Sequence, residues 1–92
     1  MVQLRDSRKM SHTKVDYHKE AMTLIESLKR EGRSASALIL QEALDEAGTG
    51  TEMAMALRWQ LRRMSGEMPE WSETTRSRAV RLLAHLDHLL SA

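Results

Sequence analysis

TTRSRAVRLLAHLDHLL, residues 74–90, is the stretch of sequence that decides the fold. Its apolar residues recur every three or four positions, which places them on one side of a helix. This stripe consists of Thr75, Ala79, Leu82, Leu83, Leu86, Leu89 and Leu90. The sequence therefore predicts a long amphipathic helix over residues 69–90, with Pro69 in its first turn or Ser72 as a later cap.

Three shorter segments upstream show the same helical periodicity. They predict helices over residues 14–31, 35–47 and 50–64. Gly32 suits the end of the first, because glycine tolerates the left-handed conformation that follows many helices. Ser34 or Ser36 can cap the second helix. Thr49 and Glu52 have the spacing of a capping box at the start of the third.

The connections between these segments are short, which favours antiparallel neighbours. We therefore expect an all-α fold, a small four-helix bundle-like domain spanning residues 14–92. Residues 1–13 are polar and basic and contain few apolar side chains, so we expect them to form a flexible arm. The basic residues of this arm are Arg5, Arg8 and Lys9.

The composition narrows the function classes. The chain has 14 Lys and Arg against 13 Asp and Glu, a formal net charge of +1 that gives little overall attraction for polyanions. It contains no cysteine, which excludes disulfides, a thiolate nucleophile and cysteine-bound zinc. No apolar run approaches the ~18 residues of a membrane span, and no signal peptide is recognisable. We expect a soluble, cytoplasmic protein.

Histidines are the candidates for metal binding or acid–base chemistry. His85 and His88 have a spacing that can place two imidazoles on one metal ion, but the helical wheel offers no third ligand. His18 lies at the edge of the apolar side of its helix, where a structural role is favoured. The glycines around residues 48–51 lack the other elements of a phosphate-binding loop. We therefore predict no metal, no cofactor and no enzymatic activity.

The segment 50–64 carries a second apolar strip besides its main one. Its main strip consists of Met53, Leu57, Leu61 and Met64. Met55 and Trp59 lie together on the other side of the helix, flanked by Arg58, Arg62 and Arg63. One interpretation is a central helix that buries both strips. The other is a surface patch, because Trp, Met and Arg are enriched in the centres of protein interfaces.

By elimination, we predict a small protein–protein interaction module, such as an inhibitor, an immunity- or antitoxin-like factor or a regulatory subunit. The predicted contact residues are Met55, Arg58, Trp59, Arg62 and Arg63. The acidic face of residues 35–47 is a second candidate surface.

Two alternatives remain open. A nucleic-acid-binding regulator of helix-turn-helix type would use residues 50–64 and the basic arm. Glu52 in the first turn and the acidic preceding helix weigh against it, because phosphates attract Lys and Arg. A homodimer could form through the leucine stripe of residues 69–90, although packing inside the monomer is favoured.

Overall fold

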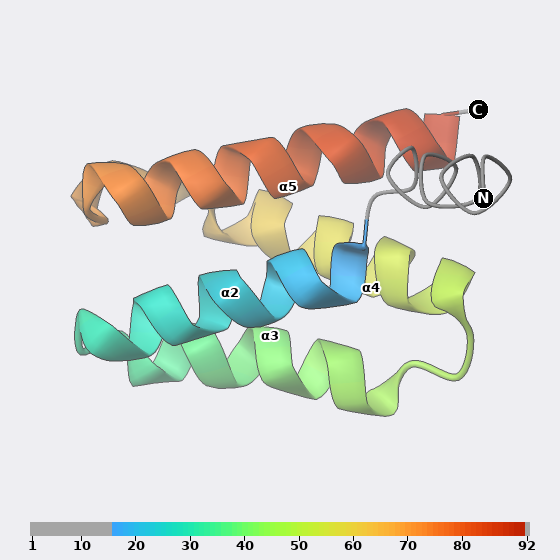
Figure 1. Ribbon diagram of the computed structural model, residues 1–92, viewed down its shortest axis with the longest axis horizontal. Helices are drawn as coiled ribbons and strands as arrows, with labels where there is room; N and C mark the ends of the chain where they lie inside the picture. Colours follow the sequence, from blue (N-terminus) through green and yellow to red (C-terminus); the bar gives the residue numbers. More distant parts are fainter. Residues whose placement is uncertain (1–15, 92) are drawn as a thin grey trace, which may run out of the picture.

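The computed structural model describes residues 16–91, all outside the predicted arm at residues 1–13 (Figure 1). Within residues 16–91 there are four α-helices: α2 (Tyr17–Arg30), α3 (Ser34–Glu46), α4 (Gly50–Arg63) and α5 (Glu73–Ser91). Two 3-10 turns, η1 (Met64–Gly66) and η2 (Met68–Glu70), join α4 to α5. No strand occurs between residues 16 and 91. The predicted all-α fold is confirmed.

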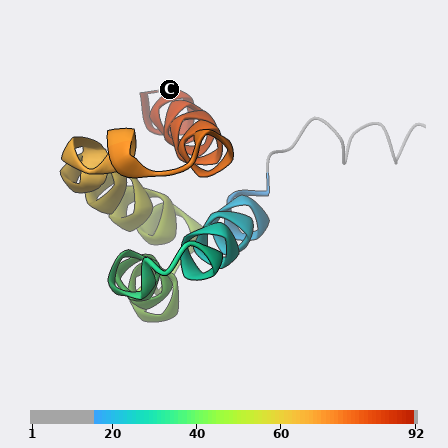
Figure 2. The same cartoon turned by 90° about the vertical axis from the view of Figure 1, so that its left-hand side faces the viewer.

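The four helices form a closed ring. Along the long axis of Figure 1 each helix runs in the opposite direction to the one before it. Each packs against its neighbours in the chain, and α5 also packs against α2. The end-on view of Figure 2 shows the four helices surrounding one interior. This is the up-and-down arrangement that short connections favour.

Leucine side chains from every helix fill the interior. The large aliphatic side chains with no exposed surface are Leu24, Ile25, Leu28, Leu40, Leu57, Leu61, Leu82 and Leu86. Burying one such side chain contributes about 1.5–3 kcal/mol relative to leaving it in water. Trp71, just before α5, is also buried and belongs to the same core. The core therefore needs all four helices.

The leucine stripe of α5 packs within the monomer. Leu82 and Leu86 are fully buried and Leu90 is partly buried against the core. Only Leu89 is substantially exposed, at 41%. The monomer therefore already uses the centre of the stripe, and a homodimer through this helix stays a prediction.

The helix α2 begins at Tyr17 rather than at residue 14, whereas its predicted stop at Gly32 agrees with the structure. Asp16 precedes the helix, and its carboxylate accepts a hydrogen bond of 2.9 Å from the backbone N–H of Lys19. Gly32 has a φ of +80°, the left-handed conformation expected after a helix. Thr49 accepts the N–H of Glu52 at the start of α4, at 3.1 Å, which confirms that capping interaction.

The start of α3 differs from the prediction. Arg33 occupies the capping position without a side-chain capping bond, and Ser34 is already helical. Ser36 is buried, and its hydroxyl donates a hydrogen bond of 2.5 Å to the Glu67 carboxylate. The prediction that a serine caps this helix was wrong, because Ser36 binds a side chain 31 residues away instead.

The start of α5 also differs. Pro69 lies in η2, and the helix begins at Glu73 rather than at residue 69. The Ser72 hydroxyl accepts the N–H of Thr75 at 3.2 Å, so the later of the two proposed caps is used. Trp71 has an extended backbone, which separates η2 from the helix.

Candidate functional site

Met55 and Trp59 lie on the outer face of α4, and their side chains are 52% and 57% exposed. The opposite side of the helix supplies Ala54, Leu57 and Leu61 to the core. The strip is therefore a surface patch, and the interpretation that it is buried between two neighbours was wrong. Large apolar side chains on a monomer surface deserve a functional explanation when they lie together.

The indole of Trp59 is held by its neighbour one helical turn away. The guanidinium carbon of Arg63 lies 4.7 Å from the centroid of the ring. Such a cation–π contact contributes about 0.5–1 kcal/mol at an exposed site. It restricts both side chains before any partner arrives, which reduces the entropy lost on binding.

Arg58 and Arg62 extend from α4 toward α5, where both meet Asp87. The Arg62 guanidinium donates a hydrogen bond of 2.8 Å to Oδ1 of Asp87, and the nearest Arg58 nitrogen is 3.7 Å from the same oxygen. The carboxylate offsets part of the positive charge beside Trp59. These two arginines tie α4 to α5, whereas Arg63 faces the other side of the helix.

A groove of about 480 Å³ lies between α3 and α4 on that other side. Its α3 wall includes Ile39, Glu42 and Glu46, and its α4 wall includes Glu52 and Arg63. Ile39 is 39% exposed. Arg63 belongs both to this groove and to the patch around Trp59, so the two features form one continuous face.

Sequence reasoning identified the acidic face of residues 35–47 but not this groove. The groove depends on which residues of α3 lie opposite which residues of α4, and that alignment is set by packing. The exposed Ile39 next to Glu42 and Glu46 was the available signal, because an aliphatic side chain outside the main stripe has no place in the core.

The histidines do not converge. Nδ1 of His85 lies 3.2 Å from both carboxylate oxygens of Glu20 on α2, while His18 and His88 are exposed. In the part of the chain from residue 16 to residue 91, no group of three or more His, Asp or Glu side chains is placed to hold a metal ion. His85 therefore joins α5 to α2 as a structural pair.

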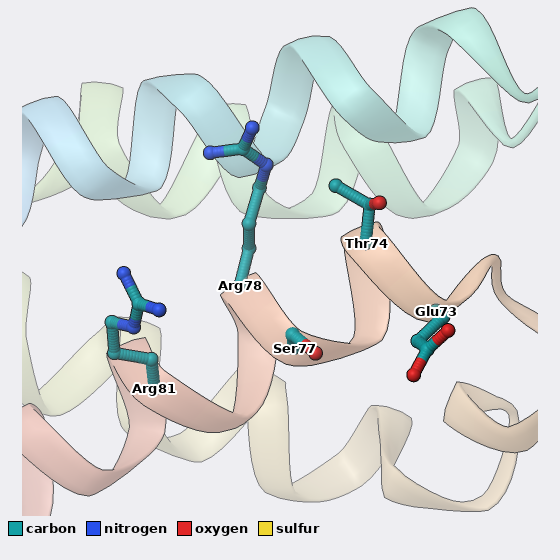
Figure 3. Close-up of a pocket in the computed structure, with 5 residues that line it drawn as sticks. All are labelled: Glu73, Thr74, Ser77, Arg78 and Arg81. Carbon is teal, nitrogen blue, oxygen red and sulfur yellow. The ribbon is translucent and has the colours of Figure 1, made fainter.

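A shallow pocket of about 420 Å³ lies over the first turns of α5 (Figure 3). It is lined by Glu73, Thr74, Ser77, Arg78 and Arg81. All five belong to one helix and are exposed, and no second element contributes a side chain. We read it as the solvated face of α5.

Glu31 makes the densest polar cluster. Its carboxylate accepts hydrogen bonds from the Ser72 hydroxyl at 2.5 Å, from the Ser72 N–H at 3.1 Å and from the Thr75 hydroxyl. Hydrogen bonds from Ser72, then Thr75, lower the pKa of Glu31 from 4.5 to about 2, with a smaller contribution from Arg33. Perturbed carboxylates can mark active sites. Here the hydrogen-bonding partners lie at the start of α5 and Arg33 lies at the start of α3, so the cluster fixes the end of α2 against its two neighbours.

Comparison of the chain with models of protein families, with curated proteins and with solved structures finds no match. No helix among residues 16–91 has the length and apolar character needed to cross a membrane. The outer face of α4, with Met55 and Trp59 exposed, is the strongest candidate for a functional surface in the described range.

Proposed function

We propose that this protein is a small interaction module that binds a partner protein through the outer face of α4, without an enzymatic activity of its own. The observation that carries the proposal is the exposure of Met55 and Trp59 on one face of a helix whose core side is otherwise complete. Their burial by a partner would remove a large apolar surface from water. The cysteine-free chain suits a reducing compartment, and we place its action in the cytoplasm.

The five proposed contact residues divide into two groups. Met55, Trp59 and Arg63 supply the exposed centre, where a stacked tryptophan is the type of residue that dominates binding energy. Arg58 and Arg62 flank it and are held by Asp87. We assign the first group the larger effect on affinity and the second group a role at the rim, where exposed charges contribute less.

The nucleic-acid alternative stays a prediction, and the arrangement lends it less support. In a helix-turn-helix the two helices cross at a steep angle, whereas α3 and α4 run side by side in opposite directions (Figures 1 and 2). Glu52 lies in the first turn of α4. Two of the three arginines of that helix already share Asp87, which weakens the attraction that they can offer to phosphates.

The test is an affinity capture of the tagged full chain from nuclease-treated lysate of its source cell. We compare wild type with Trp59→Ala and with the matched control Val80→Ala, since Val80 on α5 is 54% exposed. We expect one stoichiometric protein partner that is lost with Trp59→Ala and retained with Val80→Ala. Equal capture by all three proteins would show that the α4 face is not the binding surface.

A second measurement separates the alternative function. Binding to mixed DNA and RNA is measured at increasing salt, because phosphate contacts make affinity fall steeply with ionic strength. We expect no salt-sensitive binding. Tight binding that weakens steeply with salt and is lost on replacing Arg62 and Arg63 would favour a nucleic-acid regulator.

A further inference from the structure

The groove between α3 and α4 has room for side chains of another molecule. Ala43 and Ala56 line it with small side chains, and Ile39 is its largest exposed aliphatic residue. The groove continues through Arg63 to the exposed indole of Trp59. An apolar stripe of a partner that covers Trp59 can therefore extend into the groove without a break.

The walls of the groove carry an excess of negative charge. Glu42, Glu46 and Glu52 line it, and in the described range 16–91 none of them lies within 4.0 Å of a cationic side chain. Glu42 and Glu46 are one turn apart on α3, a spacing at which like charges destabilise a helix slightly. A cation from outside would relieve this repulsion.

In the described range 16–91, four acidic residues have internal cationic partners: Glu20, Glu26, Glu31 and Asp87. Asp87 binds two arginines, and Glu20 pairs with His85. Arg33 lies 3.7 Å from Glu31. Asp45, Glu70 and Glu73 also lack such a partner in this range, so what marks the groove is that three unpaired carboxylates, those of Glu42, Glu46 and Glu52, line one hollow on a chain whose net charge is +1.

The two ends of the groove also differ in charge. Because α3 and α4 are antiparallel, Glu46 and Glu52 lie near their connection, while Ile39 and Arg63 lie toward the opposite end. The Glu52 carboxylate is held in place there, since it accepts the N–H of Gly48 at 2.9 Å. A bound helix would be favoured with its positive N-terminal end over the two glutamates.

We infer that the partner docks with a cationic amphipathic helix, which lays an apolar stripe along the α3–α4 groove and Trp59 and places Lys or Arg opposite Glu42, Glu46 and Glu52. This inference rests on the proposed function and specifies the chemistry of the partner. The helix lies with its N-terminal end toward the α3–α4 connection. Apolar contact supplies affinity, and the charges select the partner and its direction.

The probes are three synthetic helical peptides of about 15 residues, a length at which isolated helices begin to be stable. They share one leucine face and differ only at the flanking positions, which are Lys, Gln or Glu. Binding to the intact chain is followed by fluorescence anisotropy. We expect the Lys peptide to bind at least about tenfold more tightly than the Gln peptide, because several ion pairs add together although each exposed pair contributes modestly. We expect the Glu peptide not to bind, because its charges repel those of the groove.

The charge requirement is tested with the double variant Glu42→Gln and Glu46→Gln. The matched control, Glu70→Gln with Glu73→Gln, changes the net charge equally at exposed acids outside the groove. Both glutamates of the test variant are exposed, so it should remain folded. We expect about tenfold weaker Lys-peptide binding for the groove variant and unchanged binding for the control. Equal weakening of both would overturn the inference, because it would reveal general charge attraction.

Direction is tested with two Lys peptides that confine their lysines to the N-terminal or the C-terminal half. We expect the first to bind more tightly. Concentration-dependent dimerisation of the wild type that the groove variant abolishes would also overturn the inference, since a second copy would then occupy the groove.

Failure of the inference differs from failure of the proposed function. If the cellular partner requires Trp59 but the Lys and Gln peptides bind equally, the α4 face stands as an interface and the cationic helix is wrong. If Lys-peptide binding depends on Glu42 and Glu46 but survives Trp59→Ala, the groove assignment stands and Trp59 is not the anchor.

Discussion

The hydroxyl of Ser72 donates a hydrogen bond of 2.5 Å to the carboxylate of Glu31, 41 residues earlier in the chain. The same serine oxygen accepts the N–H of Thr75 and so caps α5. One side chain thus starts the last helix and attaches it to the end of the first.

Acid should weaken the bundle through Glu31. Its pKa is about 2 in the folded chain and near 4.5 when unfolded, so the ionised form favours folding. This stabilisation is present above pH 4.5 and is lost as the pH falls toward 2. Urea denaturation at pH 7 and at pH 3 should show that Glu31→Gln is less stable than wild type at pH 7 and that the difference narrows at pH 3. A constant difference would contradict the linkage.

Removing the cap should destabilise α5. Ser72→Ala loses the bond to Thr75 and one donor to Glu31, and an N-cap replacement of this kind costs about 0.5–2 kcal/mol. Thermal unfolding by circular dichroism measures the loss. Ser65→Ala, at an exposed position in η1, serves as the control and should change stability by less than about 0.5 kcal/mol.

Two leucines of the same helix should respond differently to truncation. Leu82→Ala leaves a cavity in the core and should cost about 2–5 kcal/mol. Leu89→Ala removes a side chain that is 41% exposed and should cost clearly less. Denaturant midpoints give both values. Similar small losses would mean that α5 contributes little to the core.

The two tryptophans should report opposite environments. With Trp71→Phe, the remaining Trp59 should emit at long wavelength and be readily quenched by acrylamide, because it is 57% exposed. With Trp59→Phe, the remaining Trp71 should emit at shorter wavelength and resist quenching, because it is 3% exposed. A protected Trp59 in the free monomer would remove the anchor of the proposed interface.

The pair between Arg62 and Asp87 should be weakly coupled in stability. An exposed pair contributes about 0.2–1 kcal/mol, and both side chains here are at least 39% exposed. A double-mutant cycle with Arg62→Ala and Asp87→Ala measures the coupling directly. A coupling energy well above this range would indicate that the Arg62–Asp87 pair fixes the position of α5 against α4, in addition to flanking Trp59.

The sequence predicted the four helices well because each carries a periodic apolar stripe, as the leucines of α5 illustrate. Helix starts were predicted less well where a capping residue had a competing distant partner. Ser36 has cap chemistry, but its hydroxyl bonds Glu67, and Pro69 has the character of a first-turn residue, yet Ser72 and Glu31 fix a later start. Such choices depend on contacts between segments far apart in the chain.

The candidate site was found from the sequence only as a group of residue types. Periodicity separated Met55 and Trp59 from the main stripe of α4 but could not decide whether another helix covers them. The ring arrangement decides it, because α3 and α5 flank α4 and leave its outer face open. The stacking of Arg63 on Trp59 and the sharing of Asp87 depend on side-chain geometry, which helical spacing alone does not specify.

The contact between α5 and α2 makes the ring closed in space although the chain is open. The start of α2 and the end of α5 lie at the same end of the bundle (Figure 1), where Tyr17, Leu89 and Leu90 line one hollow. A circular permutant that joins α5 to α2 by a short linker and is cut between α3 and α4 therefore retains every interhelical interface. Such a cut falls at one end of the α3–α4 groove. Helix binding by the permutant would therefore show whether the groove needs a covalent connection between its two walls.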